Sequence, residues 1–315
     1  MLLTHLLRGL ATYIPRPNRV AMECEEGTVS ARYCYSVWLR HLVMADQSGL
    51  LTAPSVVAEL GPGDSIGTGL AALLSGVKQY YAFDVVRYVR TETNRSVLEE
   101  LIELFSARAP IPNEDEFPKV EPRLRSYDFP RRILTEERLR GALQRSRLEA
   151  IRRAISLPDD PPSDEVRIRY LAPWNDPAIL EPGSVDMIYS QAVLEHVDDL
   201  VQTYRTLHSW LRLGGFMSHA IDFKCHGTAD HWNGHWTYSD WVWKVVRGKR
   251  TYLINRQPHS VHFGLMRTLG FEILCDVPNR RGSEVGRNRL AAPFRGLSED
   301  DLEMASAFII AVKKV

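Results

Sequence analysis

Short apolar runs alternate with helical patterns along most of the chain. Residues 55–60 are apolar and β-branched, and they stop abruptly at Gly61-Pro62-Gly63. Helix formers follow at 69–74, and a second apolar run lies at 80–83. The order strand, glycine turn, helix, strand predicts a βαβ unit with parallel strands. The apolar stripe in residues 31–49, just before this unit, predicts a further helix.

Later apolar runs predict five more strands, at 166–170, 185–190, 216–221, 271–275 and 307–312. A helical pattern between the fourth and fifth strands carries Val201, Tyr204, Leu207 and Leu211. Strands that alternate with helices predict an α/β fold with a doubly wound, seven-stranded, Rossmann-like sheet. We expect a helical N-terminal extension (1–50) and one domain (51–315), with a helical insertion at 87–165 and an acceptor-site insertion at 222–265.

The insertion at 87–165 is charged and mostly helical in pattern. Asn94 is expected to cap one helix, and Thr135 is expected to cap a second helix that runs on to Ile155. Between residues 121 and 155, ten arginines stand against five acidic residues. This segment is either a solvated helical face with mixed ion pairs, the commoner case, or a lid that contacts an anionic substrate.

Composition excludes several classes of protein. Of the 315 residues, 44% are apolar and 25% are charged, which is typical of a globular domain and not of a disordered chain. Lys plus Arg and Asp plus Glu both number 39, which argues against a general nucleic-acid binder. No apolar run approaches the roughly 20 residues of a membrane span. His5 and Arg8 interrupt the apolar N-terminus, which favours a short amphipathic helix over a signal peptide. The 4 dispersed cysteines favour a cytoplasmic location.

The ends of the first two strands carry the first chemical signal. Gly61 and Gly63 lie at the carboxyl end of a strand, where parallel sheets bind ligands. Asp84 ends the second strand, 21 residues after Gly63, and a carboxylate there can accept both hydroxyls of a ribose. A nicotinamide-binding turn requires another glycine where Ile66 stands, so an NAD-dependent oxidoreductase is the least favoured interpretation.

These segments together resemble class I S-adenosylmethionine-dependent methyltransferases. Residues 59–65 resemble the first motif, with Ser65 in place of the usual third glycine, and Asp84 matches the ribose-binding acid. Residues 191–197 resemble the "LEHV" helix start of the small-molecule branch. Tyr252-Leu-Ile-Asn-Arg256 resembles methyltransferases of polysaccharide or secondary-metabolite assembly. The resemblance implies S-adenosylmethionine as the cofactor, bound by Glu59, Gly61, Gly63, Ser65, Asp84, Trp174, Asn175, Asp176, Ser190 and Gln191.

The resemblance covers roughly residues 55–222 and the last two strands, and it is specific to the cofactor but not to the acceptor. In methyl transfer, the protein supplies alignment and, for a hydroxyl acceptor, a base. Catalytic groups are therefore expected beyond the fourth and fifth strands, at Glu195, His196, Asp222 and His226.

The segment after the fifth strand has an unusual composition. It holds six of the 10 histidines, between His219 and His262, and four of the 7 tryptophans. Aromatic side chains form apolar walls, while histidines act as bases. His226 and His231 compete as general base, and His231, Trp236 and Arg256 are expected to contact the acceptor. A hydrogen bond within the loop is the alternative for each histidine, packing is the commoner role for the tryptophans, and a structural ion pair is an equal alternative for Arg256.

A metal site is weighed separately. Asp222, His226, His231 and His235 form a conceivable set of divalent-metal ligands. A metal-using branch of the family carries Glu-x-x-Glu-His after the fourth strand, but Ala192 stands at the first glutamate position here. No metal is therefore expected.

The function expected from these observations is O-methylation of a sugar-like or small hydroxylated acceptor with a histidine base. One alternative is a catalytically silent S-adenosylmethionine-binding protein with a regulatory or scaffold role. Another is a protein or nucleic-acid methyltransferase that uses the Arg-rich segment. The nucleic-acid version is disfavoured because no Asn-Pro-Pro-Tyr-like motif follows the fourth strand. The acceptor and the oligomeric state are left open.

Overall fold

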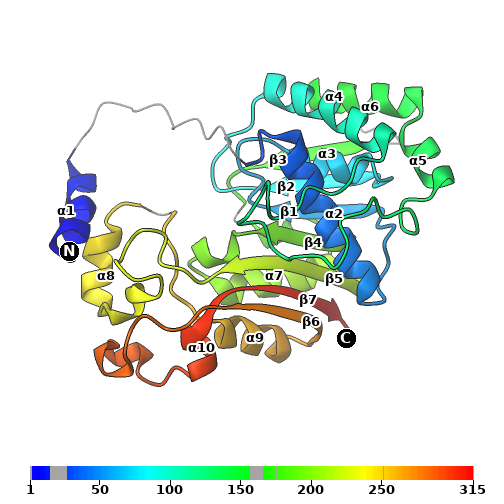
Figure 1. Ribbon diagram of the computed structural model, residues 1–315. Helices are drawn as coiled ribbons and strands as arrows, with labels where there is room; N and C mark the ends of the chain where they lie inside the picture. Colours follow the sequence, from blue (N-terminus) through cyan, green and yellow to red (C-terminus); the bar gives the residue numbers. More distant parts are fainter. Residues whose placement is uncertain (1, 15–26, 157–165, 175, 251, 315) are drawn as a thin grey trace.

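A single seven-stranded sheet runs through the molecule (Figure 1). The computed structural model describes residues 2–14, 27–156, 166–174, 176–250 and 252–314. The strand order is β3-β2-β1-β4-β5-β7-β6. Strands β1 to β5 are parallel, and β7 is antiparallel to both of its neighbours. The strands are β1 (Val56–Leu60), β2 (Gln79–Phe83), β3 (Arg167–Leu171), β4 (Val185–Gln191), β5 (Leu211–Asp222), β6 (Phe271–Arg280) and β7 (Met304–Lys313). The predicted doubly wound α/β fold is confirmed.

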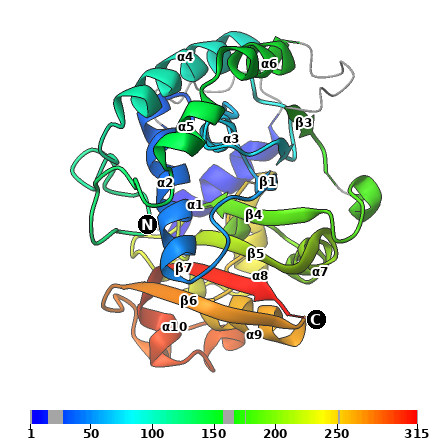
Figure 2. The same cartoon turned by 90° about the vertical axis from the view of Figure 1, so that its right-hand side faces the viewer.

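Helices cover both faces of the sheet, with α2 on one side and α7 and α9 on the other (Figure 2). The α-helices are α1 (Leu2–Leu10), α2 (Ala31–Gln47), α3 (Gly67–Leu73), α4 (Thr91–Ala107), α5 (Glu136–Ala142), α6 (Arg145–Ser156), α7 (Leu200–Trp210), α8 (Asp240–Arg247), α9 (His259–Thr268) and α10 (Glu299–Glu303). Short 3₁₀ helices are η1 (Ala11–Tyr13), η2 (Pro177–Ile179), η3 (Leu194–His196), η4 (Gly234–Thr237), η5 (Arg287–Arg289) and η6 (Ala292–Phe294).

The strands are apolar on both faces because each face is covered. On β1, Val57 packs with the α2–α4 side and Ala58 packs with the α7–α9 side. Successive residues of a strand point to opposite faces, so a strand in the middle of a two-sided sheet reads as a continuous apolar run. This is why the strands could be recognised from short apolar runs without polar alternation.

The helix boundaries differ from the predicted ones in three places. Thr135 caps as predicted, accepting from Arg138 N at 3.3 Å, but the helix after it is two helices, α5 and α6. Asn94 lies inside the first turn of α4, and its side-chain oxygen accepts from Ile66 N at 3.1 Å. Asn94 therefore does not cap α4 but links this helix to the turn after β1. Leu211 begins β5 and does not belong to α7.

The Arg-rich insertion contacts the loop between α3 and β2. Arg138 Nε donates to the Ser75 carbonyl at 2.7 Å, and Arg147 Nη2 donates to the Leu73 carbonyl at 3.0 Å. Arg152 pairs with Glu99 at 2.7 Å on the surface. Arg138 and Arg147 thus lie near the point where the chain enters β2, at the end of that strand opposite to Asp84. The Arg152 pair fits an ion-paired surface, whereas Arg138 and Arg147 attach the insertion to backbone carbonyls.

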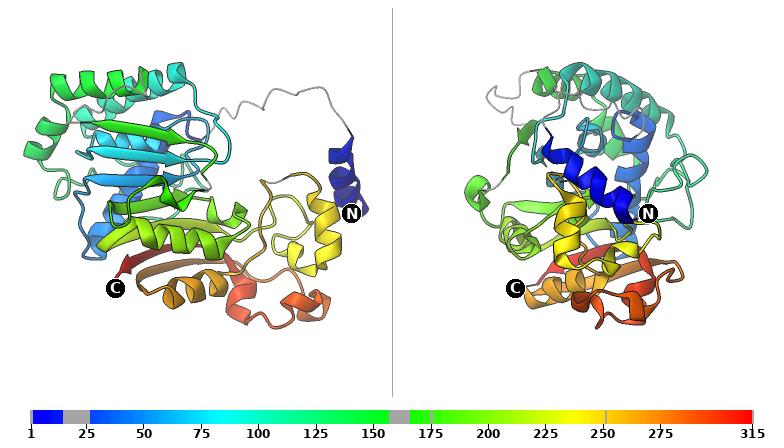
Figure 3. Two further views of the ribbon diagram at one scale, coloured as in Figure 1. Left: turned by 180° about the vertical axis from the view of Figure 1, so that it is seen from behind. Right: turned by 90° about the vertical axis from the view of Figure 1, so that its left-hand side faces the viewer.

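Helix α1 lies against α8 of the second insertion (Figure 3). His5 Nε2 is 3.4 Å from Asp230 Oδ1, and Leu6 packs against the cluster that includes Val246. Leu3 and Leu7 remain exposed. Among the helices of the described residues, none combines the length and hydropathy that a bilayer-spanning segment needs.

Candidate functional site

The predicted site residues come from the carboxyl ends of neighbouring parallel strands. Strand β1 leads into the Gly61–Gly63 turn, and β2 ends before Asp84. Strand β4 leads into η3, and β5 ends at Asp222. Because β1, β2, β4 and β5 are parallel and contiguous in the sheet, these four ends lie along one edge.

The turn after β1 requires glycine at two positions. Gly61 and Gly63 have φ angles of 62° and 74°, in the left-handed region that other residues avoid. A Cβ on Gly61 would also lie 2.6 Å from Val193 Cγ2, so the bare backbone packs directly under the segment after β4. Ser65 donates its hydroxyl to the Thr28 carbonyl and accepts from Gly67 N at 3.0 Å. Its hydroxyl is thus used to hold the turn.

Asp84 is 7% exposed and sits beside this turn. Its Oδ1 accepts from Val85 N at 2.7 Å, and Tyr170 donates to its Oδ2 at 3.4 Å. Burial raises the pKa of Asp84, opposed by backbone hydrogen bonds that include one from Gly63. Val85 and Val86 follow immediately and are 68% and 52% exposed. This exposed apolar pair was not predicted, although the two valines directly after Asp84 are visible in the sequence.

Three other predicted cofactor residues turn their side chains into the protein. Glu59 is buried, accepts a hydrogen bond from the Tyr80 hydroxyl, and has a pKa that burial raises to about 7. Ser190 is fully buried, with Oγ 2.8 Å from His219 Nδ1. Gln191 is half-buried and donates from Nε2 to the Glu121 carbonyl at 3.2 Å. These side chains therefore stabilise the strand ends through hydrogen bonds inside the protein.

The segment predicted to meet adenine is only partly available to a ligand. Trp174 is half-buried, with its ring 5.8 Å from Phe83 and 5.7 Å from Trp210, and its backbone N donates to the Asp84 carbonyl at 3.2 Å. Asp176 is exposed and caps η2 by accepting from Ala178 N at 2.8 Å. Asn175 lies outside the described residues.

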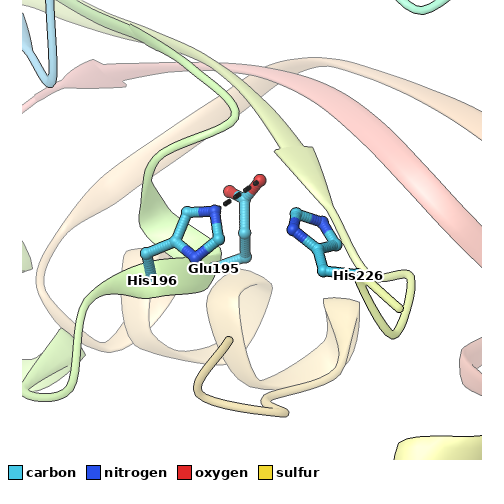
Figure 4. Close-up of side chains that lie close together, drawn as sticks. All are labelled: Glu195, His196 and His226. Carbon is cyan, nitrogen blue, oxygen red and sulfur yellow. Dashed lines mark ion pairs between the residues drawn. The ribbon is translucent and has the colours of Figure 1, made fainter. Parts of the chain in front are cut away.

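Glu195, His196 and His226 converge at the ends of β4 and β5 (Figure 4). One potential ligand atom from each lies within 4.8 Å of the others. Glu195 is 2% exposed, and neither carboxylate oxygen has a hydrogen-bond partner. Burial, reinforced by the negative charge of Asp222, raises the pKa of Glu195 well above its usual range. The His196 and His226 rings meet edge-on with centroids 5.0 Å apart.

The two histidines and Asp222 have different electrostatic surroundings. Burial, with a contribution from His226, lowers the pKa of His196 to about 4, so its imidazole is neutral at pH 7. Asp222 Oδ2 lies 3.3 Å from His226 Nε2, and Asp222 Oδ1 lies 2.8 Å from Lys224 Nζ. Burial opposes ionisation of Asp222, but these two partners outweigh it and hold its pKa at about 2.

Asn255 fixes the turn that carries Glu195 and His196. Its side-chain amide donates to the carbonyls of Leu194 and Val197, each at 2.8 Å, and its backbone N donates to the Glu195 carbonyl at 2.6 Å. The sequence analysis did not assign Asn255 a role. The Tyr-x-x-Asn-Arg segment was its only signal.

Arg256 and Trp236 have structural partners. Arg256 is 7% exposed, pairs with Asp240 Oδ1 at 2.6 Å, and lies over the Trp243 ring at 5.0 Å. Trp236 is fully buried and donates to the Arg256 carbonyl at 3.0 Å. For Arg256, the geometry favours the structural ion pair over a grip on the acceptor. For Trp236, it favours packing.

The four ligands considered from sequence do not form one group, although Asp222 and His226 are paired. His231 Nδ1 lies 3.4 Å from Glu284 Oε2. His235 is 1% exposed, has its ring tilted at 50° to that of Trp236 with centroids 4.6 Å apart, and has a pKa that burial lowers to about 3. Within the part of the chain that the structure describes, the grouped metal-ligand types are instead Glu195, His196 and His226.

No protein-family model and no curated protein matches the sequence. Solved structures do. The chain is similar to an S-adenosylmethionine-dependent methyltransferase from Mesorhizobium loti, at 14% identity, TM-score 0.41, and coverage of 91% of this chain and 100% of that one. It is also similar to a geranyl diphosphate methyltransferase in complex with SAM (13%, TM-score 0.43, 88% and 85% covered). A third similar structure is that of phosphoethanolamine N-methyltransferase 2 from Haemonchus contortus in complex with S-adenosyl-L-methionine. Its sequence identity is 12% and its TM-score is 0.42, with 91% of this chain and 58% of that one covered.

Proposed function

We propose that the protein is an S-adenosylmethionine-dependent methyltransferase that methylates a hydroxyl group of a small or sugar-like acceptor, with a histidine as the base. The proposal rests on one observation, which is that two groups of residues lie along the same edge of the sheet. A left-handed glycine turn with the Asp84 carboxylate lies at the ends of β1 and β2, and the Glu195–His196–His226 group lies at the ends of β4 and β5.

The part of the site formed by the turn after β1, Asp84 and the two valines that follow it fits a cofactor with a ribose and a flat base. Gly61 and Gly63 give the chain the left-handed turn at the carboxyl end of β1, the end at which parallel sheets bind ligands. Asp84 supplies a carboxylate for two ribose hydroxyls, and Val85 and Val86 supply exposed apolar surface next to it. When bound, S-adenosylmethionine supplies a methyl group activated by its positively charged sulfur.

His226 is the proposed base. Its side chain is 27% exposed, which leaves it accessible to an acceptor, and the ionised Asp222 faces its Nε2. That pairing favours the tautomer with the proton on Nε2, so Nδ1 is left to take the proton of the acceptor hydroxyl. Asp222 then stabilises the imidazolium, which returns the proton to solvent. His196, neutral at pH 7, is a second proton acceptor beside it.

The Arg-rich insertion gives little support to a nucleic-acid substrate. Arg138 and Arg147 donate to backbone carbonyls at the far end of α3. Arg152 is paired with Glu99. Groups used in this way do not form a basic track for phosphates at the candidate site.

Titration calorimetry tests the proposal with S-adenosylmethionine and S-adenosylhomocysteine, and with NADH as the negative control. We expect binding of the first two by the wild type and its loss in Asp84→Ala. Failure of the folded wild type to bind either compound contradicts the proposal. If both bind, a panel of hydroxylated acceptors tests transfer, and intact transfer by His226→Ala would contradict the assigned base and leave the cofactor assignment standing.

A further inference from the structure

The Glu195 carboxyl group is buried beside the imidazole of His196, with Oε1 4.0 Å from Nε2 (Figure 4). Only 2% of the residue is exposed, and neither oxygen has a hydrogen-bond partner. A buried polar group without a partner costs about 1–3 kcal/mol, and more if it is charged. A buried carboxyl group without a hydrogen bond, next to an imidazole nitrogen that is too distant to donate one, marks a position where a ligand can supply the missing interactions.

We propose that Glu195, His196 and His226 bind a divalent transition-metal ion of the zinc type. One carboxylate oxygen and two imidazole nitrogens are the three-ligand set with which catalytic zinc sites leave a fourth position open. Imidazole nitrogens favour zinc and its neighbours over magnesium or calcium, which take oxygen ligands. With the fourth position open, the site requires no further protein ligand.

The geometry requires only a local adjustment. The three ligand atoms lie within 4.8 Å of one another, and tetrahedral zinc with bonds of about 2.0–2.1 Å places its ligands about 3.3 Å apart. His226 provides the adjustment because its side chain is partly exposed and it belongs to the loop after β5. Its φ angle of 47° is in the left-handed region, and strained backbone of this kind concentrates at functional sites.

The surroundings resemble the outer shell of a metal site. Asp222 Oδ2 is 3.3 Å from His226 Nε2, and ligating histidines commonly donate one ring N–H to a carboxylate. Lys224 pairs with the other oxygen of Asp222, which leaves Oδ2 to His226. Asn255 holds the backbone of Glu195 and of the residues on either side of the turn. The ligands are thus oriented by groups that do not themselves bind the ion.

The inference deepens the proposed function, and its catalytic consequence rests on it. A metal with an open position would lower the pKa of a coordinated hydroxyl, whose proton would leave to solvent. In the metal-loaded protein, Nδ1 of His226 would then be a ligand, and the ion would take over the task assigned above to His226 as base. Binding of the metal itself requires neither the methyl donor nor the acceptor. Metal binding and cofactor binding can therefore be measured separately.

The test uses the full chain, stripped with a chelator and dialysed. Cobalt(II) is titrated with visible absorption as the readout, and zinc is titrated by calorimetry. We expect one ion per chain, with the absorption bands of four- or five-coordinate cobalt. Glu195→Gln and His226→Ala should each weaken binding at least about 10-fold, and Asp222→Asn about 10- to 100-fold. His231→Ala is the matched control, because His231 belongs to the same insertion as His226 and also faces a carboxylate, that of Glu284, but lies outside the group.

Two outcomes overturn the inference. One is a folded wild type, checked by circular dichroism, that takes up neither ion. The other is a His231→Ala variant that loses as much affinity as His226→Ala. Calorimetry with S-adenosylmethionine on the same samples separates the two claims. Metal uptake without cofactor binding supports the metal site and contradicts the proposed function. Cofactor binding without metal uptake supports the proposed function and contradicts the metal site.

Discussion

Asp222 and His226 form a carboxylate–imidazole pair at the end of β5, with Oδ2 3.3 Å from Nε2. The two residues are four positions apart, and the left-handed backbone of His226 turns its ring back toward the strand end. The pair joins the end of the sheet to the Glu195–His196 turn. Asp222 acts through His226 and is a positioning residue.

Asp222→Asn is expected to lower kcat by about 10²-fold or more and to leave KM for the cofactor nearly unchanged, because an amide neither fixes the imidazole tautomer nor stabilises its cation. Steady-state kinetics and the pH–rate profile measure this. Asp222→Glu, which keeps the charge, should recover part of the loss. A full kcat in Asp222→Asn would remove Asp222 from the mechanism.

Gly61→Ala is expected to weaken S-adenosylmethionine binding, since the new Cβ meets Val193 and the φ angle of 62° costs about 1–2 kcal/mol for a residue with a side chain. The double variant Gly61→Ala/Val193→Ala relieves the clash but not the backbone strain. Calorimetry should therefore show partial recovery. Complete recovery would mean that the clash alone matters, and wild-type affinity in Gly61→Ala would contradict the role of the turn.

Asn255→Ala is expected to destabilise the fold by about 2 kcal/mol, because it leaves the carbonyls of Leu194 and Val197 without their donor. Urea unfolding measures the free energy of unfolding. The same change should reduce metal affinity and transfer activity, because the turn that carries Glu195 is no longer fixed. Asn255→Asp, which keeps the size but loses the donor, should resemble Asn255→Ala, and a stability equal to wild type would contradict this account.

Glu59→Gln is expected to change how stability depends on pH. Burial raises the pKa of Glu59 from 4.5 to about 7 in the folded protein, so its stabilising contribution is full below pH 4.5 and is lost as the pH rises through 7. Across that window the loss is about 3 kcal/mol at most. The difference between wild type and Glu59→Gln in urea unfolding at pH 5 and pH 8 measures it. The exposed Glu103→Gln is the control, and an identical pH dependence in wild type and Glu59→Gln would disprove the assignment.

The strands and their ends were predictable because they depend on local patterns. Short apolar runs, the Gly61–Gly63 turn and the position of Asp84 are all visible along the sequence. The contacts of Asn94, Asn255 and Tyr170 were not, because each joins segments 28 or more residues apart. Nothing local distinguishes an asparagine that caps its own helix from one that holds a distant turn.

The local sequence also does not show which histidine of the loop after β5 belongs to the site. His226 and His231 are five residues apart with similar neighbours, yet only His226 reaches the Glu195 turn. The left-handed backbone at His226 decides this, and a non-glycine residue in that conformation carries no local sequence signal. Arg256 was open to two interpretations for a related reason, because only the folded structure shows that Trp243 and Asp240 enclose it.

The place of β7 in the sheet has a consequence for synthesis on the ribosome. Residues 304–313 are made after β6, yet they lie between β5 and β6, and β6 pairs only with β7. Until β7 emerges, β5 and β6 both expose unpaired edges, which are the features that recruit chaperones or promote aggregation. The loop after β5, with Asp222 and His226, can settle only once that strand has inserted. The strands β1 to β4 can pair before residues 304–313 are made, whereas the part of the sheet that carries Asp222 and His226 must wait for them.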